Sequence, residues 1–160
     1  MSIYPLSEHT KIILPNTNFS NDGRRAATLS IVEILDKRVG IASLHLETMV
    51  MRLPKRTQQL ERVIDVIGEI EPDIDHVIIG GDFNSFFKKD KRVFNTLMDN
   101  EGYKNITPDD EHTDTSVFGI IKSRLDYIYC KGCHHVSSGI GSESDASDHH
   151  TVYSVMKLLD

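Results

Sequence analysis

The first half of the chain alternates between strand-like and helix-like patterns of apolar residues. A short strand is expected over residues 11–14, followed by a loop rich in Asn and Gly over residues 16–24. Residues 27–35 and 39–46 are apolar and β-tolerant, and the short polar turn between them predicts a hairpin. Further along, apolar side chains recur at the spacing of an amphipathic helix over residues 57–70: Leu60, Val63, Ile64, Ile67 and Ile70.

The second half continues the mixture of helix and strand. Residues 76–80 are continuously apolar, which predicts a short strand buried on both faces. A second helix is expected over residues 92–100, with Gly102 as its stop signal. Such a mixture indicates an α/β (α+β) class with layered sheets and covering helices. The rest of the chain predicts a loop at 103–119, a strand at 125–130, a hairpin or long loop at 131–147, and a final strand at 152–158.

Length and composition are those of one soluble domain. The chain has 160 residues, 39% of them hydrophobic and 26% charged, so we expect a single domain over residues 1–160. Its longest apolar runs are far shorter than the roughly 20 residues of a membrane-spanning helix. The N-terminus has neither a basic start nor an apolar stretch, so no signal peptide is expected and a cytoplasmic location is predicted.

The net charge of −6 argues against a broad basic surface that grips nucleic acid regardless of sequence. It does not exclude a nuclease, because bound metal neutralises acidic ligands and a local basic segment can hold phosphate. The favoured interpretation of the local basic segment is a solvated helix face and its approach. That segment contains Arg52, Lys55, Arg56 and Arg62.

Polar side chains gather where the predicted strands end. Taken one at a time, each cluster is explained by helix capping, by a local ion pair or by simple exposure. Together they supply what metal-assisted phosphoryl hydrolysis needs: carboxylates for a hard cation, an amide that contacts phosphate and metal, and a histidine oriented by a carboxylate. The clusters are Ser-Leu-His45-Leu-Glu47, Gly-Gly-Asp82-Phe-Asn84, Arg-Leu-Asp126-Tyr-Ile and Ser-Asp148-His149.

In order and spacing, these motifs resemble the signatures of the endonuclease/exonuclease/phosphatase superfamily, which includes deoxyribonuclease I. The resemblance covers nearly the whole chain, since Ser2-Ile-Tyr-Pro is similar to the segment before His45 in that family. It implies a two-sheet β-sandwich flanked by helices. It also implies a phosphoesterase that cleaves phosphodiester or phosphomonoester bonds by in-line attack of activated water, with nucleic acid among the candidate substrates.

The resemblance also implies a role for each motif residue. Asp82 and Asn84 would hold the attacking water, the phosphate and a metal, with Asp148 as a further metal ligand. The metal would be Mg²⁺ or Mn²⁺, because the ligands are hard oxygens. His149 would contact the scissile phosphate or act as base, with Asp126 orienting it. A final histidine, which binds phosphate or protonates the leaving oxygen, would be His45.

The family pattern begins with a half that carries an early Asn and a metal-ligating Glu, and Met1 falls after both. Glu8 does not stand in that motif. Three alternatives stay open: a fragment of a longer enzyme, a short member whose ligand comes from elsewhere, and a catalytically impaired chain or binding module. A missing N-terminal half would leave the final strand without neighbours, so we expect self-association, or weak activity that a preceding segment restores.

A competing motif is Cys130-Lys-Gly-Cys133-His134, which matches the pattern for covalent haem attachment and supplies half of a zinc site. The absence of an export signal argues against haem, and the absence of a second Cys/His pair at suitable spacing argues against structural zinc. We expect two reduced thiols in a strand and turn, with a disulfide as the other interpretation.

Overall fold

The computed structural model describes residues 2–15, 25–108, 112–116, 121–141 and 147–159. The predicted loop over 16–24 therefore lies outside the described residues, as do parts of the segments 103–119 and 131–147. None of the described helices is long and apolar enough to cross a membrane.

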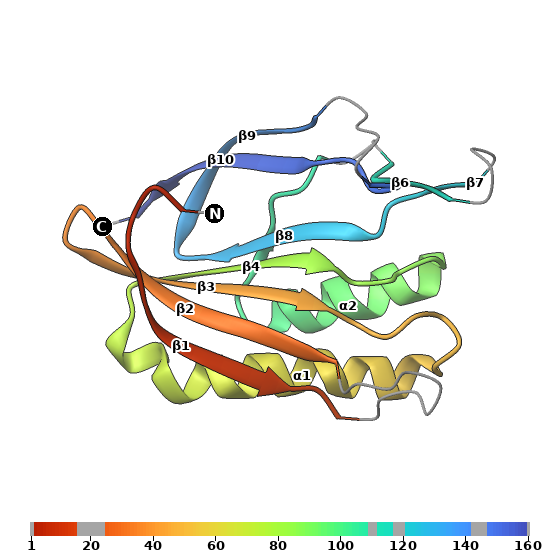
Figure 1. Ribbon diagram of the computed structural model, residues 1–160, viewed down its shortest axis with the longest axis horizontal. Coiled ribbons are helices and arrows are strands. Elements are labelled where there is room, and N and C mark those ends of the chain that lie inside the picture. Colours follow the sequence, from red (N-terminus) through yellow and green to blue (C-terminus); the bar gives the residue numbers. More distant parts are fainter. Residues whose placement is uncertain (1, 16–24, 109–111, 117–120, 142–146, 160) are drawn as a thin grey trace.

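A six-stranded mixed sheet forms the centre of the fold, in the order β1-β2-β3-β4-β8-β5 (Figure 1). The β2–β3 pair is the predicted antiparallel hairpin, whereas β3 and β4 run parallel and are connected through α1. Strand β8 returns antiparallel to β4. The strands are β1 (Leu6–Ile13), β2 (Ala26–Ile34), β3 (Lys37–His45), β4 (His76–Asp82), β8 (Asp126–Lys131) and β5 (Lys104–Asn105).

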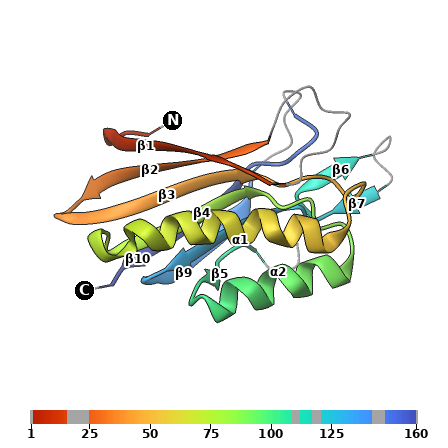
Figure 2. The ribbon, with the colours of Figure 1, turned by 90° about the horizontal axis from the view of Figure 1, so that it is seen from below.

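Two helices, α1 (Leu53–Ile70) and α2 (Lys88–Asn100), lie on the same side of this sheet (Figure 2). The short 3-10 helix η1 (Glu71–Asp73) follows α1. Leu60, Val63 and Ile67 of α1 are fully buried in one core cluster with apolar residues of the central strands. Burial of this helical stripe stabilises the packing of α1 on the sheet, because each fully buried aliphatic side chain contributes roughly 1.5–3 kcal/mol.

Two smaller sheets complete the described structure. The antiparallel pair β9 (Cys133–Ile140) and β10 (Val152–Leu158) forms one, and β6 (Asp114–Ser116) with β7 (Ile121–Ser123) forms the other. The expectation that the final strand lacks neighbours is therefore wrong, because β10 pairs with β9 along its whole length. The tight β8–β9 turn brings the Cα atoms of Cys130 and Cys133 to 6.1 Å, and the two sulfur atoms form a disulfide. The expectation of two reduced thiols is therefore wrong, and paired sulfurs are not available as haem or zinc ligands.

The predicted mixed α/β class is confirmed, and most predicted elements are present with shifted ends. The first strand begins at Leu6 rather than at residue 11, and the second helix begins at Lys88 rather than at residue 92. The predicted loop over 103–119 contains β5 and β6. These short strands carry little hydrophobic pattern of their own, and they form because β8 and β7 offer backbone partners.

Candidate active site

The register of the central sheet places three of the predicted residues in one row. His45 on β3 is paired with Asp82 on parallel β4, and Asp82 is paired with Asp126 on antiparallel β8. Neighbouring strands lie about 4.8 Å apart, so the three side chains occupy adjacent positions at one edge of the sheet. The sequence predicted three strand-end residues, and the structure brings them together.

The chain leaves β4 through a tight turn that depends on glycine. A Cβ atom on Gly81 would lie 1.9 Å from the carbonyl oxygen of Leu44, and the positive φ of 143° is also unfavourable for other residues. Two residues later Asn84 also has a positive φ, of 48°. Its backbone N–H donates to Oδ1 of Asp82 at 2.7 Å, and its side-chain Nδ2 donates to the Leu46 carbonyl at 2.8 Å. The turn therefore holds the Asp82 carboxylate and the Asn84 amide in one fixed arrangement.

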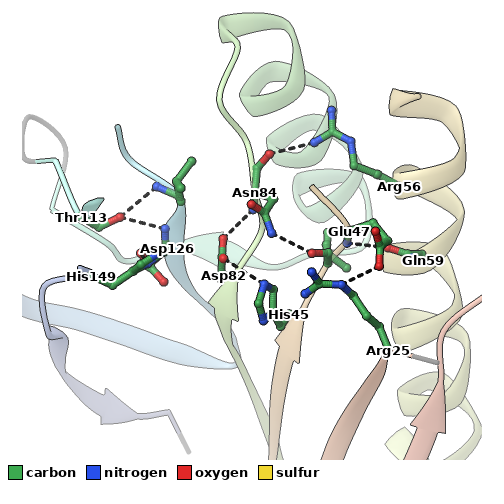
Figure 3. A network of polar contacts seen from close by, with 12 residues as sticks. Arg25, His45, Glu47, Arg56, Gln59, Asp82, Asn84, Thr113, Asp126 and His149 are labelled. Atoms are coloured by element: carbon green, nitrogen blue, oxygen red, sulfur yellow. Dashed lines mark hydrogen bonds and ion pairs between the residues drawn. The ribbon is translucent and has the colours of Figure 1, made fainter. Parts of the chain in front are cut away.

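His149 and Asp126 form the histidine–carboxylate pair that the motifs predicted. Nδ1 of His149 lies 2.8 Å from Oδ2 of Asp126, as Figure 3 shows. The Asp126 end of β8 is fixed by Thr113, whose hydroxyl oxygen accepts hydrogen bonds from the backbone N–H groups of Leu125 and Asp126 at 2.9 and 3.0 Å. A carboxylate at Nδ1 leaves Nε2 of the ring to accept or donate a proton at a substrate.

His45 and Asp82 are also in contact, with 3.3 Å between Nε2 and Oδ2. Burial raises the pKa of Asp82 to about 6, although the hydrogen bond from the Asn84 backbone acts in the opposite direction. The pKa of His45 is lowered, first by burial and then by the positive charge of Arg25. Near neutral pH the row therefore contains a neutral imidazole beside a carboxylate that lacks full charge compensation.

A second set of residues, absent from the predicted site, fixes this edge of the sheet from the α1 side. Arg25 precedes β2, and its Nε donates to Oε1 of Glu47 at 2.6 Å. Glu47 is buried, and its backbone N–H donates to Oε1 of Gln59 on α1 at 2.9 Å. The amide of Gln59 donates in turn to the carbonyl of Pro15 at 2.8 Å. This chain of contacts connects α1 to the edge that carries His45 (Figure 3).

Arg56, also on α1, makes the second connection. Nη1 of Arg56 donates to the Asn84 carbonyl at 2.8 Å, and Nη2 pairs with Oδ2 of Asp90 at 2.9 Å. Both side chains of the ion pair are almost completely buried. The expectation of a solvated basic helix face is therefore wrong for Arg56, although it holds for Arg52, Lys55 and Arg62, which are exposed.

The predicted metal ligands are only partly gathered. Asp82 and Asn84 share the β4 turn, and Asp148 is an exposed residue beside His149. Among the described residues, no group of three or more His, Cys, Asp or Glu side chains has the arrangement of a metal site. This does not fit structural zinc, which needs four N or S ligands, but Mg²⁺ is often held by one or two carboxylates with water and substrate phosphate.

Sequence reasoning found the strand-end residues but not Arg25, Gln59, Arg56 or Asp90. A weak signal existed for Arg56, because it stands four and seven residues before buried Leu60 and Val63, on the apolar face of the helix. For Arg25, at the end of a polar loop, the sequence offers no local signal.

Comparison with known proteins identifies solved structures that share this fold. No protein-family model and no curated protein matches the chain. Among solved structures, an endonuclease/exonuclease/phosphatase from Beutenbergia cavernae superposes with a TM-score of 0.74 at 18% identity, over 98% of this chain and 46% of that one. A mannosyl-6-phosphatase from Bacteroides thetaiotaomicron gives a TM-score of 0.74 at 14% identity, over 97% and 67% of the two chains.

A third structure is TDP2 from D. rerio in complex with a single-stranded DNA product. Its TM-score is 0.71 at 19% identity, over 95% of this chain and 68% of that one. The chain thus has the fold of endonuclease/exonuclease/phosphatase proteins and spans between 46% and 68% of the length of these three chains.

Proposed function

From the endonuclease/exonuclease/phosphatase fold that this chain displays, we propose that it is a divalent-metal-dependent phosphoric ester hydrolase. The observation that carries the proposal is the row of His45, Asp82 and Asp126 across three adjacent strands, with His149 held against Asp126. A row of acid, base and amide groups at one sheet edge suits attack by water on phosphorus.

The residues assigned to the metal are Asp82, Asn84 and Asp148, and the ion is Mg²⁺ or Mn²⁺. Support comes from the raised pKa of Asp82, because a buried carboxylate with too little compensating charge favours a bound cation. When bound, the metal would polarise the phosphoryl oxygens and lower the pKa of attacking water.

The remaining residues carry the proton transfers and the positioning. Asp126 at Nδ1 keeps the His149 ring in one tautomer, so that Nε2 accepts the proton of the attacking water or contacts the phosphate. The lowered pKa of His45 keeps that ring neutral near pH 7, where it donates a hydrogen bond to a phosphate or leaving oxygen. Asn84 contributes its amide from the turn after β4, where its backbone N–H also donates to Asp82.

The substrate class is a phosphodiester or a phosphomonoester, and two of the structurally similar proteins suggest which substrates to test first. One neighbour is a mannosyl-6-phosphatase and another was solved with single-stranded DNA. We therefore propose a sugar phosphate and single-stranded DNA as the first substrates for a panel.

The deciding experiment measures hydrolysis of both substrates in Mg²⁺, with excess chelator as the second condition. Asp82→Ala should lower turnover by about 10²-fold or more, the usual scale for a positioned acid–base or charge-stabilising group. Asp99→Ala, an exposed aspartate near the end of α2, is the matched control and should keep full turnover. Unchanged turnover in chelator refutes the metal, and unchanged turnover in folded Asp82→Ala refutes the site.

A further inference from the structure

Arg25 places a positive charge beside Asp82, at the edge of the sheet that carries the candidate active site. The side chains near it include the carboxylates of Glu47 and Asp82, in a chain whose net charge is −6. A phosphate ester that approaches this edge meets repulsion unless a cation compensates. Arg25 is a fixed cation here that does not depend on pH, because its guanidinium stays protonated in proteins.

The guanidinium is anchored from behind. Glu47 holds its Nε, and this carboxylate is only 1% exposed while the Arg25 side chain is 19% exposed. The ion pair is therefore buried on its glutamate side and open on its arginine side. Glu47 is itself fixed through Gln59 of α1, so the position of the guanidinium is set by the core of the protein.

The open side of Arg25 is turned toward the candidate active site. Figure 3 shows the guanidinium between Glu47 and His45, with Asp82 beyond the imidazole. Its charge acts on both groups, since it helps to lower the pKa of His45 and of Asp82. Among the described residues Glu47 is the only ion-pair partner of Arg25, and it engages Nε alone, so the two terminal nitrogens have no carboxylate of their own.

We propose that Arg25 is a phosphate-binding residue whose terminal nitrogens bind non-bridging oxygens of the substrate phosphate on the His45 side of the site, with Glu47 as its positioning residue. The inference rests on the proposed phosphoesterase function and adds to it a residue that its motifs do not contain. A planar guanidinium held at Nε presents two parallel N–H donors, the geometry that suits a phosphate. The substrate phosphate would thus bind between the Arg25 guanidinium and the histidine–carboxylate pair of His149 and Asp126.

The alternative is that the Arg25–Glu47 pair is only a structural link between two strands. The molecule offers a matched control for it, because Arg38 pairs with Glu8 at the same 2.6 Å. Arg38 stands near the start of β3, at the other end of the strand from His45. Arg38→Gln therefore removes an arginine–glutamate pair of equal length that lies away from the site.

The test measures the affinity of the full chain for inorganic phosphate by calorimetry, beside KM and kcat for the substrates of the panel. Arg25→Gln should weaken phosphate binding about tenfold or more, as expected for the loss of a charge-assisted contact. KM should rise by a similar factor. Arg25→Lys should recover part of the phosphate affinity. The phosphate affinity of Glu47→Gln should lie between those of Arg25→Gln and the unchanged chain. The phosphate affinity of Arg38→Gln should stay within about twofold of that of the unchanged chain.

Equal phosphate affinity in Arg25→Gln and Arg38→Gln overturns the assignment, and so does a wild-type chain that binds no phosphate. If Arg25→Gln does not fold, Arg25→Lys decides, since a purely structural pair predicts unchanged affinity in that variant. Phosphate binding that depends on Arg25 in a chain without hydrolysis supports this inference while refuting the proposed function. Hydrolysis that is lost in Asp82→Ala but unchanged in Arg25→Gln supports the proposed function and refutes the role of Arg25.

Discussion

The two sides of the candidate active site are built in different ways. On the α1 side, Asn84, Glu47, Gln59 and Arg56 are all buried, and hydrogen bonds connect them to a helix that packs in the core. On the β8 side, Asp126 and His149 are 20% and 29% exposed, and His149 follows residues 142–146, which lie outside the described part of the chain.

Because of this difference, we expect substitutions on the two sides to have different effects, on stability in one case and on turnover in the other. A buried polar group that loses its partner is left desolvated without compensation, which lowers the free energy of unfolding. Substitutions on the α1 side should therefore first reduce stability. A partly exposed pair such as Asp126 and His149 finds water when one partner is removed. Substitutions on the β8 side should therefore reduce turnover in a chain that remains folded.

The largest expected effect is on the α1 side, in Arg56→Met. This change leaves the Asp90 carboxylate buried without its cation, and the Asn84 carbonyl loses one of its two donors and keeps only the Phe86 N–H. Removing one partner of a buried ion pair costs about 3–5 kcal/mol in the free energy of unfolding. Urea denaturation followed by circular dichroism measures it.

Arg62→Met is the control for this measurement, since Arg62 is exposed on the same helix. It should change the free energy of unfolding by less than about 0.5 kcal/mol. Equal stability of the two variants would show that the Arg56–Asp90 pair does not support the Asn84 turn.

On the β8 side, His149→Ala should lower turnover about 10²-fold, because general acid–base groups contribute on this scale. Its free energy of unfolding should change by no more than about 1 kcal/mol, since a part-exposed pair contributes little to stability. Steady-state kinetics and urea denaturation on the same preparation test both halves of the statement. A His149→Ala chain that loses stability but keeps turnover would contradict the division between the two sides.

His135→Ala serves as the control for that variant. His135 is exposed on β9 and has no place in the proposed chemistry. Both its turnover and its stability should match those of the unchanged chain.

The same division marks what the sequence could predict. His45, Asp82 and Asp126 were recognisable because each follows or begins a strongly apolar strand, and strand ends align when strands pair. Arg56 was misread because a basic run near a helix start usually faces solvent, and its burial depends on Asp90, 34 residues away. Gln59 and Arg25 are set by contacts across 12 and 22 residues to Glu47, which no local pattern encodes.

The α/β class and the main helices and strands followed from hydrophobic periodicity for the same reason. Residues that bury one face of α1 or both faces of β4 have to repeat at the period of the backbone. Strands β5 and β6 have two and three residues, too few to show a period, and their pairing was not predictable. Local pattern thus predicted the strand ends of the site, while its support from α1 required the tertiary structure.

The smallest expected effect concerns Asp82, which belongs to both sides of the comparison because it lies between His45 and Asp126. Its pKa rises from 3.8 to about 6 in the folded chain, mainly through burial. At pH values below 3.8 the folded and unfolded chains both keep this proton, and the residue has no effect on stability. Between pH 3.8 and about 6 the unfolded chain loses the proton first, so stability falls as the pH rises, and above pH 6 the loss is complete.

Asp82→Asn removes this loss, because the amide is neutral at every pH and its oxygen still accepts the Asn84 N–H bond. The variant should match the unchanged chain near pH 4 and be more stable above pH 6, by at most about 3 kcal/mol, since one pKa unit corresponds to about 1.4 kcal/mol. Urea denaturation at a series of pH values measures the difference, with Asp99→Asn as the exposed control. Parallel pH profiles for Asp82→Asn and the unchanged chain would refute the raised pKa. Mg²⁺ sharpens the test: a cation held by Asp82 should raise the stability of the unchanged chain at pH 7 by more than that of Asp82→Asn, because the variant keeps Asp148 as its only charged ligand.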